Sequence, residues 1–266
     1  MTRAASRPSP SAEDSARQPR ILLFGDSHSH AVQRAIEKRT GKGKPVHVTA
    51  YRLAKMKNGK RLGDMALEEF VKVAADLAPD DVVLSMIGGN QHAVFSTIQH
   101  PQTYDFFTPG EPAPEAGVEI IPYRVVEDVF EHGLRKGDAK SLEALRKGTK
   151  ARVVHIIPPP PKADNAFIEQ NHETLFAQNN LHTHGVSPPA LRLKYWKLQT
   201  QILTKICDEL GIEVMMPPAI TVGGDGFLNP DFYARDATHA NYHYGEKLMR
   251  EVEARFLSAA PSGQDA

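Results

Sequence analysis

The sequence predicts an α/β fold in which a parallel β-sheet is covered by helices on both faces. From residue 20 onward, short apolar runs of strand length alternate with longer segments of helical periodicity. This alternation is typical of successive β-α-β units, which place helices on both sides of a parallel sheet. At 266 residues the chain has the length of one sizeable α/β domain.

Five apolar segments are predicted to form the sheet. Each is followed by glycine, proline or a polar residue, which ends the strand. The segment at 82–87 is almost entirely apolar, so we expect it at the centre of the sheet. The predicted strands are residues 21–24, 46–51, 82–87, 152–157 and 212–216.

The segments between the strands carry apolar residues three and four positions apart, which predicts amphipathic helices. Stretches 93–121 and 158–187 interrupt this pattern. Because both begin just after strands, we expect them to wall a pocket at the carboxyl edge of the sheet, although surface decoration is an alternative. The predicted helices are residues 30–39, 64–77, 123–134, 139–146, 188–210 and 241–256.

Composition narrows the class of protein. Lys plus Arg and Asp plus Glu both number 32, so no net charge indicates a nucleic-acid or membrane partner. The single cysteine, Cys207, excludes an internal disulfide and is expected to be a packed thiol. Residues 1–19 and 258–266 are expected to be disordered tails around a domain at 20–257. Without an apolar run typical of a signal peptide or transmembrane helix, we expect a cytoplasmic protein.

The first predicted strand ends at Gly25-Asp26-Ser27. In open α/β folds the carboxyl edge of the sheet binds ligands. Ser27 would also lie near a helix N-terminus, where backbone N–H groups stabilise an anion. Ser27 is therefore a candidate nucleophile. The alternative is that Asp26 or Ser27 only caps the helix, a common use of both residues.

Two later segments could complete a hydrolytic site. Gly88-Gly89-Asn90 follows the third strand, and an asparagine side chain there can donate an N–H to an oxyanion. Asp236 precedes His239 by three residues, which lets the carboxylate reach the imidazole and fix its tautomer. Each signal is common by itself, and together they favour a nucleophile over a cap.

These three segments, in this order, resemble the SGNH (GDSL-type) hydrolase family. The resemblance extends over about residues 20–257, and His28 after the serine resembles the variant common among carbohydrate O-acetyl esterases. It implies a flavodoxin-like three-layer α/β/α sandwich with a parallel five-stranded sheet. It also implies catalysis without a metal or other cofactor.

The resemblance assigns the catalytic roles. Ser27 would be the nucleophile, His239 the general base and Asp236 the carboxylate that orients it. The oxyanion hole would consist of the Ser27 N–H, the Gly63 N–H and the Asn90 side chain.

The remaining assignments are less direct. Gly63 is preferred because Leu62-Gly63-Asp64 precedes a predicted helix, and Gly59 is its alternative. Gln91 stands where the family usually has aspartate, which bears on the geometry of the turn more than on the chemistry. Residues expected to contact the substrate are His28, Gly89 and His92.

The predicted activity is hydrolysis of a small O-acyl ester, most simply an O-acetyl group on a carbohydrate or similar polyol, through an acyl-enzyme. Acyl transfer with the same triad is one alternative, and a non-catalytic binding module on the same fold is another. The chain from Arg34 to Arg61 carries many cations but only one acid, Glu37. A basic patch there could attract an anionic substrate, and a solvated surface is the simpler interpretation.

Overall fold

The computed structural model describes residues 17–57, 59–108, 110, 113–114, 116–172 and 181–257. Of the tails expected at 1–19 and 258–266, only residues 17–19 fall within these ranges.

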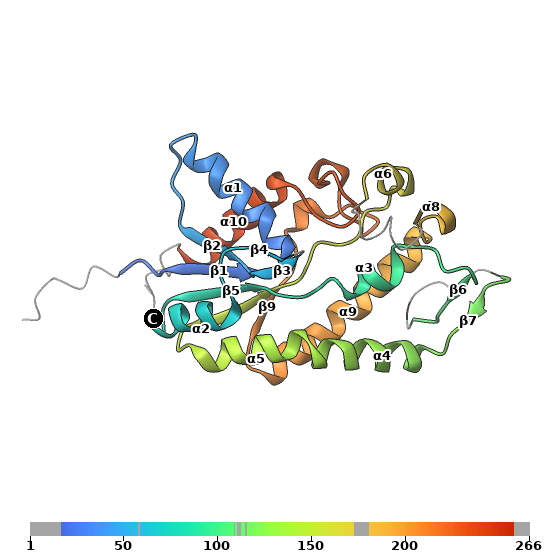
Figure 1. The fold of residues 1–266 in the computed structure, drawn as a ribbon, viewed down its shortest axis with the longest axis horizontal. Coiled ribbons are helices and arrows are strands. Elements are labelled where there is room, and N and C mark those ends of the chain that lie inside the picture. The colour runs from blue at the N-terminus through green and yellow to red at the C-terminus, as the bar shows by residue number, and fades with distance from the viewer. Residues whose placement is uncertain are drawn as a thin grey trace, which may run out of the picture.

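A parallel five-stranded sheet lies at the centre of the molecule (Figure 1). The strand order β2-β1-β5-β8-β9 is the flavodoxin-like order, with the first strand between the second and the third. The central strand β5 is buried along its whole length, as predicted. The α/β class, the five parallel strands and the flavodoxin-like order are therefore confirmed. The strands are β1 (Ile21–Gly25), β2 (Val48–Arg52), β5 (Val82–Met86), β8 (Arg152–Ile156) and β9 (Glu213–Met215).

Helices cover both faces of this sheet and complete the three-layer sandwich (Figure 1). Successive side chains of a strand point to opposite faces, and β1 follows this rule. Leu23 packs with α1 (His30–Thr40) and α10 (Tyr242–Phe256), whereas the Phe24 ring stacks on Phe70 of α2 at 4.4 Å. The second face is covered by α2 (Leu67–Ala75), α4 (Tyr123–Lys136), α5 (Asp138–Gly148) and α9 (Pro189–Glu209).

The helix predicted over 64–77 begins later, at Leu67. Glu69 accepts a hydrogen bond from the Ala66 N–H at 2.6 Å, and this contact fixes the start of α2. Several short elements were not predicted, because a few residues carry too little periodicity. They are η1 (Ser27–Ser29), β3 (Lys55–Lys57), β4 (Lys60–Leu62), α3 (Gln91–Ser96), β6 (Tyr104–Asp105), β7 (Glu119–Ile120), α6 (Asn165–Gln170), α8 (Leu181–His184), η2 (Ala219–Thr221) and η3 (Pro230–Phe232).

The two long interrupting stretches contact each other. Ile98 and Val186 form an isolated antiparallel bridge, and the Ser187 N–H donates to the Thr97 carbonyl at 3.0 Å. The stretches predicted at 93–121 and 158–187 are therefore joined where they are described. Residues 109, 111–112, 115 and 173–180 of these stretches lie outside the described ranges.

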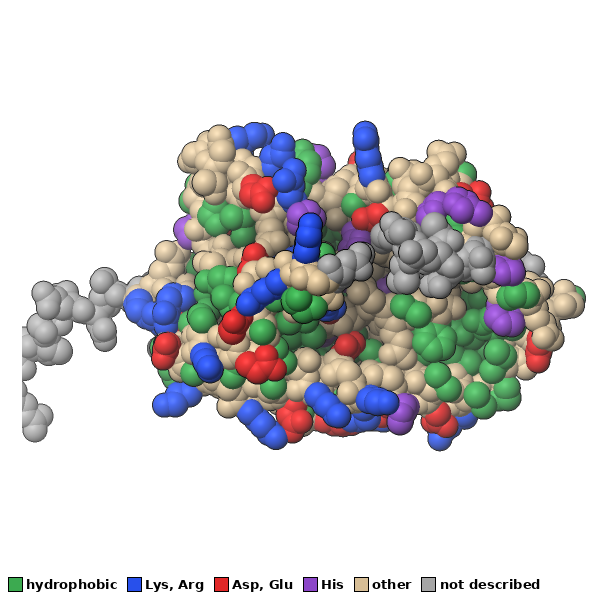
Figure 2. Space-filling view, viewed as in Figure 1, with side chains coloured by type: hydrophobic (Ala, Val, Ile, Leu, Met, Phe, Trp, Pro, Cys, Tyr) green, Lys and Arg blue, Asp and Glu red, His purple; other side chains and the backbone are tan. Residues whose placement is uncertain are grey.

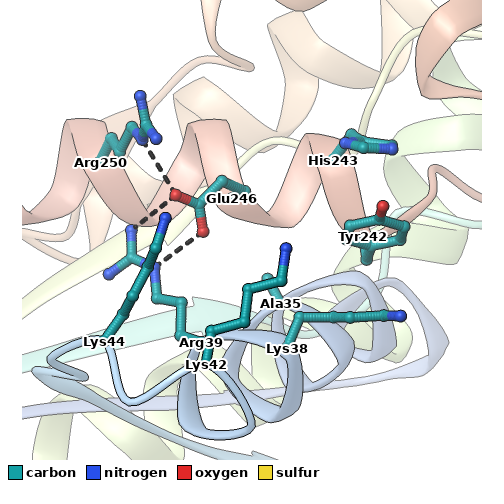
Figure 3. Close-up of a pocket in the computed structure, with 9 residues that line it drawn as sticks. All are labelled: Ala35, Lys38, Arg39, Lys42, Lys44, Tyr242, His243, Glu246 and Arg250. Carbon is teal, nitrogen blue, oxygen red and sulfur yellow. Dashed lines mark hydrogen bonds and ion pairs between the residues drawn. The ribbon is translucent and has the colours of Figure 1, made fainter.

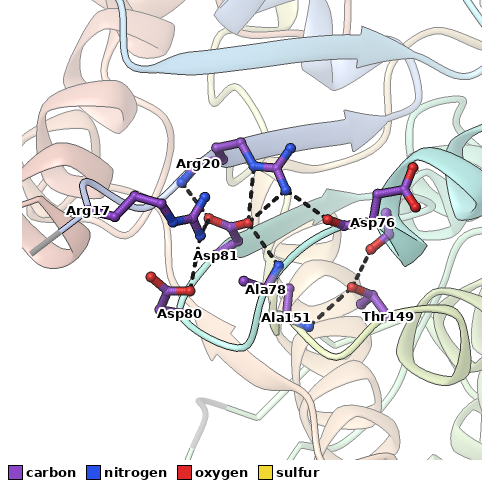
Figure 4. A network of polar contacts seen from close by, with 9 residues as sticks. Arg17, Arg20, Asp76, Ala78, Asp80, Asp81, Thr149 and Ala151 are labelled. Atoms are coloured by element: carbon purple, nitrogen blue, oxygen red, sulfur yellow. Dashed lines mark hydrogen bonds and ion pairs between the residues drawn. The ribbon is translucent and has the colours of Figure 1, made fainter.

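A buried carboxylate fastens the amino edge of the sheet. Asp81 accepts hydrogen bonds from the backbone N–H groups of Arg20 at 2.7 Å and Ala78 at 2.9 Å (Figure 4). Its side chain is 0% exposed and is also paired with Arg17 and Arg20. This contact holds the start of β1 beside the start of β5. Across the described ranges, every helix falls short of the length and apolar character that a transmembrane span requires.

Candidate active site

Ser27, His239 and Asp236 meet at the carboxyl edge of the sheet. The Ser27 Oγ lies 2.7 Å from His239 Nε2, although the two residues are 212 positions apart in sequence. His239 Nδ1 lies 3.0 Å from Asp236 Oδ2. Ser27 is placed by the end of β1, and the other two residues lie in the segment that leads into α10.

The Asp236 carboxylate fixes the protonation pattern of this group. Its Oδ1 accepts the backbone N–H groups of Thr238 at 3.1 Å and His239 at 2.7 Å, so Oδ2 remains for the imidazole. Burial opposes ionisation of Asp236, but the hydrogen bond and charge of His239 lower its pKa well below the ordinary range. An ionised carboxylate accepts from Nδ1–H, so Nε2 is the nitrogen that can accept a hydrogen bond from the Ser27 hydroxyl.

Lys162 contacts the Asp236 carboxylate, and the sequence did not predict it as part of the site. Its side chain is 0% exposed, and Nζ lies 3.5 Å from Asp236 Oδ1. Nζ also donates to the carbonyl oxygens of Ala234, at 2.7 Å, and of Asp236 itself. A buried ammonium needs such partners to offset its lost hydration. A lone lysine after a run of prolines gives no sequence signal for this role.

Asn90 lies beside His28 at the end of the third predicted strand. His28 Nε2 lies 2.9 Å from Asn90 Oδ1, and His28 is 4% exposed. Burial, with smaller contributions from His239 and His92, lowers the pKa of His28 to about 3. The imidazole is therefore neutral near pH 7, and its Nε2–H donates to Asn90 Oδ1. This contact turns the Asn90 Nδ2 group away from His28.

The turn that carries Asn90 is held on both sides. The Gly88 N–H donates to Asp26 Oδ2 at 2.8 Å, and the Gly89 N–H donates to Asp138 Oδ2 at 3.3 Å. Gly89 has φ +87°, and a Cβ there would meet Pro158 at 2.7 Å. Both groups of the Gly89 peptide are used, because its carbonyl accepts from Gln199 Nε2 at 2.9 Å.

Gln199 was also missed, since a glutamine on the apolar face of a predicted helix carries no functional signal. Its side chain is fully buried, and its Oε1 accepts the His92 N–H at 2.8 Å. Gln91, which departs from the family pattern, donates its side-chain amide to the Phe130 carbonyl at 3.2 Å instead. Asp26, Asp138 and Gln199 therefore hold the turn, and Gln91 faces α4.

The two glycines considered for the oxyanion hole occupy different places. Gly63 has φ +101°, and a Cβ there would lie 2.5 Å from the carbonyl oxygen of Leu53. Leu53 in turn donates its N–H to the Gly25 carbonyl at 2.8 Å, directly before the Ser27 turn. Gly59 lies in the turn between β3 and β4, where a Cβ would meet nothing within 4 Å. Close packing beside the Ser27 turn thus distinguishes Gly63 from Gly59.

His92 is only 5% exposed, and burial lowers its pKa to about 4. It lines a cavity of about 10 Å³ together with Lys162, Arg192 and Thr238. A volume of this size accommodates about one water molecule. Within the described ranges, no group of three or more His, Cys, Asp or Glu side chains is arranged to hold a metal ion.

Fold and site together define a flavodoxin-like α/β protein with a hydrogen-bonded Ser-His-Asp group at the carboxyl edge of its sheet. No family model and no curated protein matches the sequence. Similar solved structures include a GDSL-like lipase from Bacteroides thetaiotaomicron, at 12% identity and TM-score 0.44, covering 90% of this chain and 88% of that one.

Two further similar structures have comparable values. A carbohydrate acetylesterase from Sinorhizobium meliloti is 14% identical, with TM-score 0.43 and coverage of 90% of this chain and 98% of that one. An inhibitor-bound aryl esterase from M. smegmatis is 12% identical, with TM-score 0.45 and coverage of 90% and 99%. At such distances the activity of this chain has to be argued from its own site.

Proposed function

We propose that this protein is a serine esterase that hydrolyses a small O-acyl ester through an acyl-enzyme. The observation that carries the proposal is the hydrogen-bonded chain of Ser27 Oγ, His239 and Asp236, with contacts of 2.7 and 3.0 Å. A serine hydroxyl is a weak nucleophile until a base takes its proton, and this geometry supplies that base.

In the proposed reaction, His239 Nε2 takes the Ser27 proton as Oγ attacks the ester carbonyl. Asp236 holds the imidazole and stabilises the imidazolium that forms. His239 then returns the proton to the leaving alcohol, which yields the acyl-enzyme. Water, deprotonated by the same imidazole, releases the acid and restores Ser27. The proposed substrate is an O-acetyl group on a carbohydrate or similar polyol, a preference that rests on the His28 variant of the first motif.

The developing oxyanion needs donors, and we assign three to it. Ser27 begins the short helix η1, so its N–H has no intrahelical acceptor. The Asn90 side chain supplies the second donor and the Gly63 N–H the third. His28 is assigned to the site through its contact with Asn90. Gly89 is assigned to it because it directly precedes Asn90, and His92 because it lies in the first turn of α3, which Asn90 caps.

The decisive test of this proposal is labelling with a fluorophosphonate, which forms a covalent bond only with an activated serine. Folded wild-type protein is expected to be labelled, and the Ser27→Ala variant is expected to remain unlabelled. The same two proteins are then compared on p-nitrophenyl esters of increasing acyl length, with acetate expected to react best. Equal labelling of the two proteins, or a folded wild type that takes no label, would exclude the esterase.

A double-mutant cycle tests whether Asn90 and His28 act as one unit. Asn90→Ala is expected to lower kcat by about 10²–10³, the loss typical of one oxyanion donor. His28→Leu removes the group that orients the amide, so we expect at least a tenfold loss in kcat with little change in KM. His28→Gln, which can still donate to Asn90 Oδ1, is expected to restore part of this activity.

The informative variant is the double substitution. In the Asn90→Ala background, His28→Leu should have no further effect on kcat, because no amide remains to be oriented. A His28→Leu loss of equal size in both backgrounds would show that His28 acts only on the structure of the site.

A further inference from the structure

A row of basic side chains runs along α1, away from the proposed nucleophile. His30, Arg34, Lys38 and Lys42 are spaced four residues apart, which places them on one side of the helix and of the turn that follows it. Figure 2 shows Lys and Arg side chains gathered over α1. The sequence allowed two interpretations of these cations, a basic patch that attracts an anionic substrate and a solvated helix surface. A solvated surface needs no hollow beside its charges, so the presence of a hollow favours the basic patch.

Two hollows accompany the row, and both are lined by Tyr242 at the start of α10. The first has a volume of about 470 Å³ and includes His30, Arg34 and Arg235 in its lining. The second has a volume of about 180 Å³ and includes Lys38 and Lys42 (Figure 3). We call the two hollows together the α1 groove. Its basic lining side chains are His30, Arg34, Lys38, Arg39, Lys42, Lys44, Arg235, His243 and Arg250.

Carboxylates neutralise only part of the positive charge of the α1 groove. Glu246 is the one acid in the lining of the two hollows, and it is paired with Arg39 at 2.7 Å and with Arg250 at 3.0 Å. Arg39 is also paired with Glu253, which lies outside the lining. Arg34 is paired with Glu37, but both side chains are more than half exposed, and such a pair contributes little. No carboxylate of the described residues is paired with the three lysines of the second hollow, Lys38, Lys42 and Lys44.

The first hollow is lined by residues that lie close in the chain to Ser27 and His239. Ser27 precedes His30 by three residues, and Ala240, which follows His239, lines the first hollow. Burial lowers the pKa of His30, the positive charges of Arg52 and Arg34 lower it further, and the charge of Glu37 partly offsets them. The 11 residues of α1 extend about 16 Å at 1.5 Å per residue, which exceeds the length of one sugar unit.

We propose that the α1 groove binds the anionic part of the substrate, and that this substrate is an acidic, O-acylated carbohydrate chain. The inference rests on the proposed esterase function. An anionic chain along α1 would present an ester group to Ser27 while its carboxylates or sulfates contact the cations of the groove. Nucleic acid has matching charge but carries no carboxylic ester for the triad to cleave.

The test compares two polymers with the same backbone, O-acetylated dextran and O-acetylated carboxymethyl-dextran. Wild-type protein is expected to cleave the anionic polymer with at least tenfold higher kcat/KM at low ionic strength. Added salt should reduce this preference, since it screens exposed charges. Lys38→Glu/Lys42→Glu is expected to lower the preference for the anionic polymer at least tenfold.

The matched control is Lys136→Glu/Lys140→Glu. It makes the same change of charge at the same spacing on exposed residues of α4 and α5, which cover the opposite face of the sheet (Figure 1). This variant should keep the preference for the anionic polymer.

Three outcomes would contradict the proposed binding of an anionic substrate in the α1 groove. Equal rates on the two polymers, or loss of the preference in both charge-reversal variants, would contradict binding of an anionic substrate in the α1 groove. If p-nitrophenyl acetate were still cleaved, the esterase proposal would stand without this inference. Stronger inhibition by oligodeoxythymidylate than by unacetylated carboxymethyl-dextran, at equal charge, would assign the groove to nucleic acid. Absence of fluorophosphonate labelling and of ester cleavage would overturn the esterase and this inference with it.

Discussion

Replacing Asp236 with asparagine is expected to lower kcat by about 10⁴, because the substitution reverses the tautomer of His239. Asp236 Oδ1 accepts two backbone N–H groups, from Thr238 and His239. An asparagine would keep its oxygen at these donors and turn its NH₂ group toward His239 Nδ1. The imidazole would then carry its proton on Nε2, facing Ser27, and could no longer accept the hydroxyl proton.

Steady-state kinetics on p-nitrophenyl acetate measure this loss, and thermal unfolding confirms that the variant is folded. Asp208→Asn, on the exposed side of α9, provides a control for the same change of charge. A folded Asp236→Asn variant that keeps kcat within tenfold of wild type would exclude the proposed role of Asp236.

Acid is expected to destabilise the protein well above the pH at which carboxylates titrate. Burial lowers the pKa of His28 to about 3 and the pKa values of His92 and His155 to about 4. As pH falls below about 6.5, these histidines take up protons in the unfolded chain but not in the native one. The native state therefore loses free energy relative to the unfolded state from about pH 6.5 down to about pH 4.

The expected size of this effect follows from linkage. Each of the three histidines removes up to about 2 kcal/mol between pH 7 and pH 5, so together they remove up to about 5–6 kcal/mol of unfolding free energy. This is a large share of the roughly 5–15 kcal/mol typical of a globular protein. Asp138 acts in the opposite direction, since burial raises its pKa and the native state then retains a proton that the unfolded state releases.

Urea unfolding at pH 7 and pH 5 measures the change. His155→Phe, in the buried strand β8, should reduce the pH dependence by about one third, because one of the three histidines is gone. His132→Gln, on the exposed side of α4, should leave it unchanged. Equal unfolding free energies at the two pH values would contradict the prediction.

The main architecture could be predicted because it depends on local periodicity. Apolar runs such as 82–87 have few alternatives to a buried parallel strand, and the helical segments between them carry amphipathic spacing. The elements that were missed, such as the β3–β4 hairpin and α3, are too short for a period to be read. The late start of α2 depends on one contact between Glu69 and Ala66.

The candidate site likewise contains residues that could be predicted from the sequence and residues that could not. Ser27, Asn90, Asp236 and His239 could be proposed from sequence because each follows a strand or precedes a helix in a short, recognisable motif. The residues that hold them in place could not. Lys162, Asp138 and Gln199 lie far from these motifs in sequence and meet them only in the folded chain.

The sequence by itself determined the order of strands and helices, the edge of the sheet at which the polar residues gather, and the residue types available there. Only the tertiary structure decided that Ser27 and His239 are within hydrogen-bonding distance, that His28 orients Asn90, and that the α1 cations border a groove. The reason is physical. Periodicity is a property of neighbours along the chain, whereas a hydrogen bond depends on positions within a few tenths of an ångström that packing of the whole domain fixes.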